Sequence, residues 1–315
     1  MIISLQKYSF VFWIAIALVL IQLTSCVPSM NANYKLGLQS SEEEKHRTAI
    51  AHFTRALMDD PTDPEIYFHR AGAKLHLEDL PGAIDDYSRA ITINRQEYKY
   101  YLNRGLVYLT LKNYDDAIRD YNQAVEIDSL NPESFFNMGY VKELLGDYSG
   151  AIDDYSKSIY RDSTDARFFV NRGNINSIIG KYENAINDYS SAINLNPEDE
   201  IAYQNRAGDY IKLGKFPEAI TDLTKAIKLD PINSNFYYSR AEAKVGLDNF
   251  LGAAVDYTHI IKLEPGDGLA YYNRGICYAN IELKENACTD FIKAGDLGLF
   301  EAYEVIREYC NKDEK

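Results

Sequence analysis

The sequence predicts an all-α solenoid made of eight helix-turn-helix repeats of 34 residues each. The first observation behind this prediction is an alanine that recurs every 34 residues from Ala49 to Ala287, without insertion or deletion. The second is that small and apolar residues recur around this alanine in two stripes with helical spacing. A fixed period of this length is typical of stacked supersecondary units, each of which buries its apolar face against its neighbours. With the alanine numbered as position 20, the repeats are 30–63, 64–97, 98–131, 132–165, 166–199, 200–233, 234–267 and 268–301.

Residues 1–25 precede the repeats and are expected to be a signal peptide. Lys7 is followed by an apolar run from Tyr8 to Leu23. A basic residue before such a run is typical of a secretory signal. The run is short for a membrane-spanning helix, which needs about 20 apolar residues.

The apolar run ends in Leu-Thr-Ser-Cys, which resembles the lipobox of bacterial lipoproteins. The resemblance implies that Cys26 receives a diacylglycerol and that residues 26–29 link this lipid anchor to the repeats. Val27 stands where many such lipoproteins carry the aspartate that retains them at the inner membrane. The expected location is therefore the cell envelope, anchored by lipid at the outer membrane and facing the periplasm. The alternative is an uncleaved N-terminal anchor with an incidental cysteine.

Each repeat is predicted to contain two antiparallel helices. Positions 4, 7, 8 and 11 share one stripe of the first helix, and positions 20, 24 and 27 share one stripe of the second. Small residues at positions 8 and 20 let the helices approach closely, while aromatic residues at positions 4 and 24 fill the space between them. Glycine in several turns and proline at position 32 favour the ends of the two helices. Packing therefore explains most of the 26 tyrosines.

This pattern resembles the tetratricopeptide repeat. The marks of that family are an aromatic residue at position 4, small residues at positions 8, 20 and 27, further aromatic residues at 11, 17 and 24, and proline at 32. The resemblance covers residues 30–301 and implies a right-handed superhelix whose first helices line a concave groove. Repeats 1 and 8 depart most from the pattern, as the ends of such arrays usually do. Residues 302–315 are expected to form a helix that caps the last repeat.

The composition argues against several classes of function. A net charge of −14 disfavours nucleic-acid binding, which needs a basic surface. The sequence has no phosphate-binding loop, nucleophile elbow or zinc-binding motif, so we expect neither an enzyme nor a cofactor or metal. His69 and His76 lie seven residues apart on one helix, but no further ligand completes a metal site there. The preferred interpretation of this pair is a solvated face of the helix.

Position 6 of the first helix carries asparagine in five repeats: Asn103, Asn137, Asn171, Asn205 and Asn273. This row resembles the asparagine ladder in the repeat superhelix of O-linked GlcNAc transferase, whose amides hold the backbone of an extended peptide. An amide both donates and accepts hydrogen bonds, which suits a peptide backbone of any sequence. The aromatic residues expected to accept the peptide's apolar side chains are Phe68, Phe136, Tyr140, Tyr238 and Tyr272. The alternative is that the asparagines only cap or solvate the helix.

Arginine at position 7 and aspartate at position 23 recur together in six repeats. They are expected to form structural ion pairs: Arg70 with Asp86, Arg104 with Asp120, Arg172 with Asp188, Arg206 with Asp222, Arg240 with Asp256, and Arg274 with Asp290. The alternative, an arginine ladder for an acidic ligand, is disfavoured because each of these arginines has a matching aspartate.

Three cysteines remain beyond the lipidation site. Cys288 lies on the second helix of the last repeat, and Cys310 lies on the terminal helix that is expected to pack against it. This closing segment resembles that of many bacterial repeat lipoproteins, which implies a disulfide between the two cysteines in an oxidising compartment. Cys277 is the competing partner for Cys288.

Two functions are compatible with these features. The leading hypothesis is a membrane-anchored, non-enzymatic scaffold that binds a protein or extended peptide in its groove, in envelope assembly, secretion or a related complex. The alternative is a structural adaptor of an envelope complex that uses its convex or edge surfaces and binds no ligand in the groove.

Overall fold

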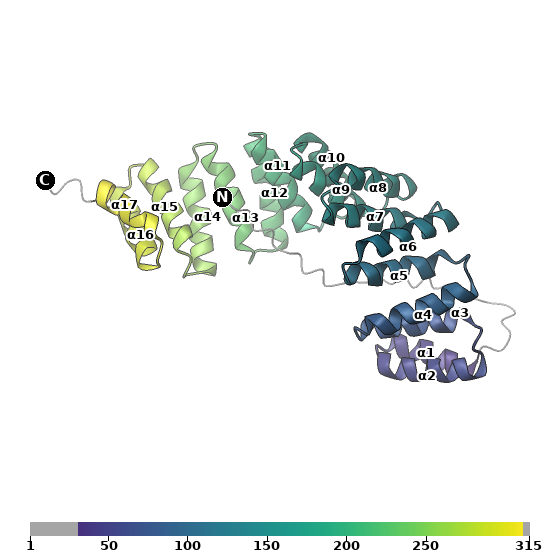
Figure 1. Cartoon of the computed structure of the whole chain (residues 1–315). Helices are drawn as coiled ribbons and strands as arrows, with labels where there is room; N and C mark the ends of the chain where they lie inside the picture. The colour runs from purple at the N-terminus through teal and green to yellow at the C-terminus, as the bar shows by residue number, and fades with distance from the viewer. Residues whose placement is uncertain (1–30, 311–315) are drawn as a thin grey trace. The chain divides into compact units, whose positions relative to one another are not determined.

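The computed structural model describes residues 31–310, which form helices joined by short turns (Figure 1). The leader and the predicted lipidation site Cys26 lie outside the described residues. The helices are α1 (Ala32–Glu42), α2 (His46–Asp59), α3 (Pro64–His76), α4 (Leu80–Ile93), α5 (Tyr98–Thr110), α6 (Tyr114–Ile127), α7 (Pro132–Leu144), α8 (Tyr148–Arg161), α9 (Ala166–Ile178), α10 (Tyr182–Leu195), α11 (Glu200–Lys212), α12 (Phe216–Leu229), α13 (Ser234–Val245), α14 (Phe250–Leu263), α15 (Gly268–Asn280), α16 (Lys284–Asp296), α17 (Phe300–Val305) and a π-helical turn (Ile306–Cys310). In the described part of the chain there is no strand, as an all-α solenoid requires.

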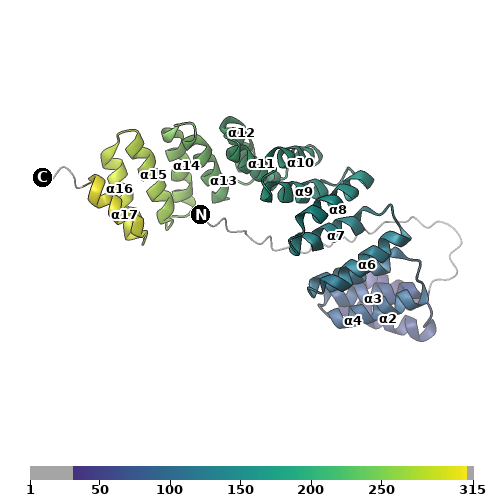
Figure 2. The same ribbon diagram turned by 45° about the horizontal axis from the view of Figure 1, so that its top comes forward.

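The described chain divides between Ile93 and Asn94 into two compact parts. The N-terminal part holds α1 to α4, which are repeats 1 and 2, and the C-terminal part holds repeats 3 to 8 and the closing segment. Within the C-terminal part each repeat is an antiparallel pair of helices (Figures 1 and 2). From α7 onward, the first helix of each repeat also packs against the second helix of the repeat before it. The buried apolar clusters of this part accordingly each include residues of two neighbouring repeats.

The alanines that define the period lie where the two helices of a repeat come closest. All eight of them are fully buried. In the five repeats with glycine at position 8, the position-24 ring covers that glycine: a Cβ atom on Gly105 would lie 2.6 Å from the Tyr121 ring, and one on Gly173 would lie 2.9 Å from the Tyr189 ring. Nonbonded carbon atoms prefer separations of about 3.5–4.0 Å. Glycine at position 8 therefore leaves space for the aromatic ring to pack between the two helices of the repeat.

The turn between the two helices requires a left-handed residue at position 15. Glycine supplies it in three repeats, with φ of 78° at Gly146 and Gly180 and 70° at Gly214. The other five repeats place a larger residue in the same conformation: Glu44, Glu78, Lys112, Asp248 and Glu282, with φ between 55° and 62°. A side chain in this region costs about 1–2 kcal/mol. Helix packing therefore sets this turn even where the local sequence does not favour it.

A largely buried ion pair joins the two helices of six repeats. In repeat 6 the Nε and Nη2 atoms of Arg206 donate to the two carboxylate oxygens of Asp222, each over 2.7 Å. The same two-pronged geometry joins Arg70 to Asp86, Arg104 to Asp120, Arg172 to Asp188, Arg240 to Asp256 and Arg274 to Asp290. These aspartate side chains are at most 7% exposed. This bidentate geometry constrains the orientation of the two helices, and the arginine compensates the charge of the buried aspartate.

The same arginine also contacts the preceding repeat. Arg206 Nη1 donates to Ser190 Oγ over 2.8 Å, and this hydroxyl in turn donates to the carbonyl oxygen of Ile186. Four other arginines donate to the hydroxyl at position 25 of the repeat before: Arg70 to Thr54, Arg172 to Ser156, Arg240 to Thr224 and Arg274 to Thr258. Each of these arginines therefore links three helices from two repeats.

Repeat 4 shows how the arrangement changes when the arginine is missing. Position 7 is Met138, and position 25 of the preceding repeat is Asn122 instead of serine or threonine. The buried carboxylate of Asp154 accepts instead from Lys142 Nζ at 2.6 Å and Lys157 Nζ at 2.8 Å. The arginine and the hydroxyl are thus absent together, while the aspartate keeps cationic partners.

The closing segment packs on the last repeat. Cys288 and Cys310 form a disulfide, with their Cα atoms 5.7 Å apart. Cys277 is buried and has a free thiol, and burial raises its pKa to about 11. The single capping helix expected over 302–315 differs from the structure: α17 begins at Phe300, directly after the left-handed Gly298 has ended the preceding helix, and it gives way to the π-helical turn.

We expect Arg206→Met to lower the free energy of unfolding by about 3 kcal/mol, because it leaves the buried carboxylate of Asp222 without its two donors. The double variant Arg206→Met with Asp222→Leu should be clearly more stable than Arg206→Met alone, since no buried charge is then stranded. Urea unfolding of the wild type, both single variants and the double variant measures the difference.

Arg240→Met is the matched control. Asp256 keeps Lys244 Nζ at 2.7 Å when its arginine is removed, so this variant should lose less stability than Arg206→Met. Strictly additive effects of Arg206→Met and Asp222→Leu would contradict an energetic role for the pair.

Candidate functional site

The predicted asparagine row lies on the first helices of the C-terminal part. We call the residues at positions 2, 5, 6 and 9 of α5, α7, α9, α11, α13 and α15 the first-helix face. Successive first helices contact one another, as α5 and α7, α9 and α11, and α11 and α13 do. All five asparagines at position 6 are half-buried, so their amides can be reached from solvent. The repeat therefore brings the predicted residues together in a row.

Several of these amides already donate within the protein. Asn103 Nδ2 donates to the carbonyl oxygen of Lys99, and Asn171 Nδ2 donates to that of Arg167, each over 2.8 Å and one helical turn back. Asn205 Nδ2 donates instead to Asn174 Oδ1 over 3.1 Å. An amide has two N–H donors and an acceptor oxygen, so one internal bond leaves capacity for a ligand. These internal bonds also orient each amide before a ligand arrives.

Asn174, at position 9 of repeat 5, is a polar residue that the sequence interpretation missed. Its Oδ1 accepts from the Tyr189 hydroxyl at 2.8 Å and from Asn205, which belongs to the next repeat. The Tyr189 ring is almost fully buried at position 24. Asn174 thus connects the asparagine row to the core of its own repeat and to the neighbouring repeat.

The position-5 aromatic residues lie closer to the core than a ligand pocket would require. Each packs on the position-24 ring of its own repeat, with ring centroids 5.6–5.9 Å apart: Phe68 on Tyr87, Phe136 on Tyr155, Tyr238 on Tyr257 and Tyr272 on Phe291. Phe136 is only 7% exposed, which corrects the expectation that it accepts a ligand side chain. The physical reason is that position 5 adjoins the packing stripe at positions 4 and 8.

The remaining aromatic candidates are more accessible. Tyr140, Tyr238 and Tyr272 are half-buried. The Tyr238 hydroxyl donates to Asp267 Oδ2 over 2.6 Å, and that aspartate caps α15, the first helix of the next repeat. Phe68 is also half-buried but belongs to α3, in the N-terminal part of the chain.

Charges on the first-helix face are largely compensated near its middle. Arg167, at position 2 of repeat 5, pairs with Glu133 at position 2 of repeat 4 and with Asp165. Its guanidinium also lies over the Phe136 ring, 5.3 Å from the centroid, and so covers that residue. The face therefore offers amides and tyrosines more than net charge, which fits a ligand recognised through its backbone.

Two acids on this side of the chain, Asp209 and Glu143, accept hydrogen bonds from neighbouring side chains. Burial raises the pKa of Asp209 to about 6, and its carboxylate Oδ1 accepts a hydrogen bond from Ser177 Oγ at 2.6 Å. Its side chain is 2% exposed and links repeats 5 and 6. Burial also raises the pKa of Glu143, which accepts from the Tyr155 hydroxyl at 2.7 Å. Both acids serve as internal hydrogen-bond acceptors.

The two histidines considered for a metal site do not face each other. His76 stacks on His46 with centroids 4.3 Å apart, and His69 lies 5.8 Å from the Tyr34 ring. Across residues 31–310 no three histidine, cysteine or acidic side chains are grouped so as to hold a metal ion. Over the same residues no helix is both long and apolar enough to cross a membrane.

Comparison with known families identifies the repeat. The description "Tetratricopeptide repeat" matches residues 34–98, 98–129, 132–165 and 166–199, and the description "TPR repeat" matches residues 209–247. Together these matches span more than half of the chain. No curated protein matches the sequence.

Solved structures show the same architecture. The C-terminal part of a TPR repeat-containing protein from Cytophaga hutchinsonii is 19% identical and covers 76% of this chain and 98% of its own, with a TM-score of 0.65. A tetratricopeptide repeat protein from Parabacteroides merdae is 18% identical over 78% of this chain and 97% of its own, with a TM-score of 0.55. Pseudomonas aeruginosa pilF is 19% identical over 67% and 96%, with a TM-score of 0.52. At these identities the likeness is one of fold.

Proposed function

The chain belongs to the tetratricopeptide repeat family, and we propose that it is a non-enzymatic scaffold that binds an extended segment of a partner protein along its first-helix face. The observation that carries this proposal is the run of Asn103, Asn137, Asn171 and Asn205 at the same position of four consecutive repeats. A repeat holds identical side chains at a regular spacing, which matches the regular spacing of peptide groups in an extended ligand. The amides bind the backbone, so this mode of recognition tolerates many ligand sequences.

The half-buried tyrosines supply the apolar contacts in this proposal. Tyr140 lies on the face beside the asparagine row, and Tyr238 and Tyr272 lie further toward the C-terminus. An aromatic ring offers a large contact area for little conformational entropy. The asparagines would hold the ligand backbone, while the tyrosines would contact its side chains.

A structural adaptor is the second candidate. The internal bonds of Asn103, Asn171 and Asn205 favour it, because these amides already have a role within the protein. In that case the asparagines orient neighbouring helices, and other surfaces join the chain to an envelope complex. Replacing the asparagines separates the two functions, because an adaptor of this kind would keep its affinity.

We further propose that the scaffold is anchored by lipid at Cys26 and works in the cell envelope, at the outer membrane and facing the periplasm. The support is the Leu-Thr-Ser-Cys sequence directly after the apolar run. The Cys288–Cys310 disulfide supports the same location, since disulfides persist in oxidising compartments and are rare in the cytosol. Envelope assembly or secretion is the setting that such a tethered scaffold suits.

Replacing Asn103, Asn137, Asn171 and Asn205 together by alanine should weaken partner binding at least tenfold. Each amide contact contributes about 0.5–1.5 kcal/mol, and about 1.4 kcal/mol is one factor of ten. The measurement is the affinity of the quadruple variant for the partner recovered by pulldown from an envelope extract, together with its thermal unfolding.

The matched control replaces four exposed asparagines of the second helices: Asn122, Asn184, Asn187 and Asn194. This variant should bind as the wild type does. Unchanged affinity in the first-helix variant, with an intact fold, would contradict the proposal and favour the adaptor.

Radiolabelled palmitate should enter the wild-type chain and fail to enter Cys26→Ala, because the acyl chains are attached through this cysteine. Cys277→Ala is the control for cysteine loss and should label as the wild type does. Equal labelling of wild type and Cys26→Ala would reject the lipid anchor.

A further inference from the structure

The second helices carry a row of isoleucines that is interrupted in repeat 7. Position 21 is isoleucine in the first six repeats: Ile50, Ile84, Ile118, Ile152, Ile186 and Ile220. In repeat 7 it is Ala254, which is buried, and in repeat 8 it is the bridged Cys288. Alanine lacks three carbon atoms of the isoleucine side chain. The smaller side chain of Ala254 therefore leaves a space on α14 that isoleucine occupies in the first six repeats.

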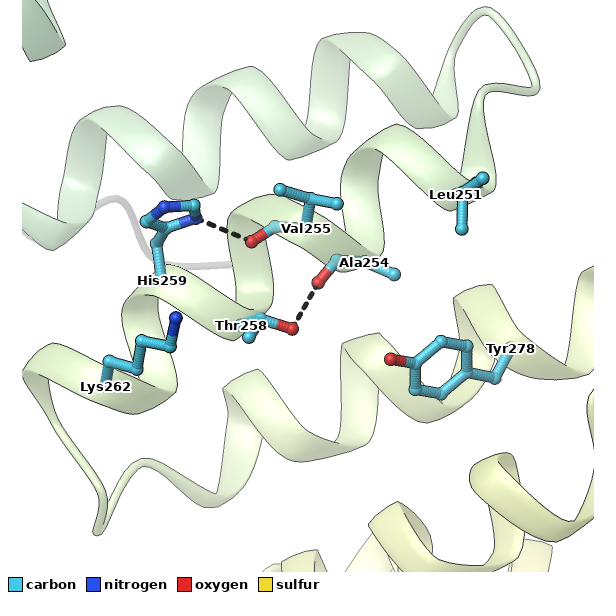
Figure 3. A pocket seen from close by; sticks show the side chains of 7 residues that line it. All are labelled: Leu251, Ala254, Val255, Thr258, His259, Lys262 and Tyr278. Atoms are coloured by element: carbon cyan, nitrogen blue, oxygen red, sulfur yellow. Dashed lines mark hydrogen bonds between the residues drawn. The ribbon is translucent and has the colours of Figure 1, made fainter.

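A pocket of about 170 Å³ occupies this place, between α14 and Tyr278 of the next repeat (Figure 3). Leu251 and Val255 form its rim and are 62% and 49% exposed. Position 22, where Val255 stands, is occupied in the other repeats by smaller or more polar residues: Ala51, Asp85, Arg119, Asp153, Asn187, Thr221 and Thr289. Repeat 7 thus exposes a larger apolar side chain at this position than any other second helix does.

Hydrogen bonds hold the walls of this pocket in place. Thr258 Oγ1 donates to the carbonyl oxygen of Ala254 over 2.8 Å and accepts from Arg274 Nη1 of the next repeat at 3.0 Å. His259 Nδ1 donates to the carbonyl oxygen of Val255 over 2.8 Å, and its ring stacks on Tyr237. These polar groups are engaged within the protein and leave the apolar walls to a ligand. A ligand would therefore meet a preformed surface, which reduces the entropic cost of binding.

The charge of the pocket has one sign. Lys262 lines it, and no carboxylate is among its lining residues. Within residues 31–310, the Lys262 ammonium forms no ion pair with a carboxylate. The ammonium group on an otherwise acidic chain favours a ligand that carries a carboxylate near its apolar group.

The volume limits the size of the ligand. Sites for cofactors and drug-sized molecules usually enclose about 300–1,000 Å³. A pocket of about 170 Å³ instead accommodates a single branched or aromatic side chain. We propose that this pocket is a docking site for a partner-protein segment that inserts one branched apolar side chain against Ala254 and places a carboxylate beside Lys262.

Methyl NMR of the full chain tests this site with three probes. N-acetyl-leucine has the apolar side chain and the carboxylate, N-acetyl-leucinamide lacks the charge, and N-acetyl-glycine lacks the side chain. N-acetyl-leucine should shift the methyl signals of Leu251, Ala254 and Val255 saturably, and should bind about threefold more tightly than the amide. N-acetyl-glycine should leave these signals unchanged.

Ala254→Ile should abolish the shifts, because it restores the row and fills the pocket. The fold should tolerate this change, since the first six repeats carry isoleucine at the same position. Val255→Asp, at the exposed rim, provides a second variant that should also abolish the shifts without entering the core.

Lys262→Gln should remove the preference for N-acetyl-leucine over the amide. Lys228→Gln is the matched control, because Lys228 stands at the same position of repeat 6, is exposed and lies outside the pocket. Absence of saturable shifts, or equal shifts in Ala254→Ile, would overturn the proposal. Shifts that follow protein concentration without any probe would assign the pocket to a second copy of the chain and would also overturn it.

Discussion

The interaction on which the array most depends is the arginine at position 7. Its guanidinium binds the position-23 carboxylate of its own repeat and the position-25 hydroxyl of the repeat before, as Arg206 binds Asp222 and Ser190. Burial of a charge pair contributes little net stability, but it strongly penalises any arrangement in which the pair is broken. The arginine therefore acts mainly by fixing how each repeat sits on its neighbour. Repeat 4 lacks both the arginine and the preceding hydroxyl, which is the pattern expected if the two groups are needed together.

Fixed contacts between repeats also explain how the first-helix face can work as a binding surface. An extended ligand gains from several weak amide contacts only if those amides keep a constant spacing, since mobility would add an entropic cost at every repeat. The bond from Asn205 to Asn174 and the bond from Tyr238 to the Asp267 cap hold neighbouring first helices in the same way. The arginine row and the asparagine row thus depend on the same periodic geometry, one inside the array and one at its surface.

The sequence was sufficient for the two helices of each repeat and for the matched arginine and aspartate rows, because eight copies of one strict period all show the same pattern. It was not sufficient for the closing segment, which lies outside the repeats and follows no period. It did not predict the left-handed Lys112 or Glu78, because the packing of the two helices imposes that turn against local preference. It placed Phe136 in a ligand pocket, because helical spacing alone does not separate position 5 from the adjoining packing stripe. The sequence shows the recurring hydroxyl residues at position 25, which include Ser190 and Thr224. Their role as acceptors became clear only from the structure, in which the arginine of the next repeat reaches them. The pocket beside Ala254 likewise requires the structure, because the sequence shows the break in the isoleucine row but not that Leu251, Val255 and Tyr278 enclose a space there.

A double-mutant cycle between Ser190→Ala and Arg206→Met tests the coupling of neighbouring repeats most directly. The two residues belong to different repeats and are joined by the 2.8 Å bond from Arg206 Nη1 to Ser190 Oγ. We expect a coupling free energy of about 1.5 kcal/mol in urea unfolding, the lower end of the range for a hydrogen bond with a charged donor. Asn122→Ala, at the equivalent position before the repeat that lacks the arginine, should change stability by less than about 0.5 kcal/mol. Additive effects of Ser190→Ala and Arg206→Met would contradict the account, because the arginine would then stabilise only its own repeat.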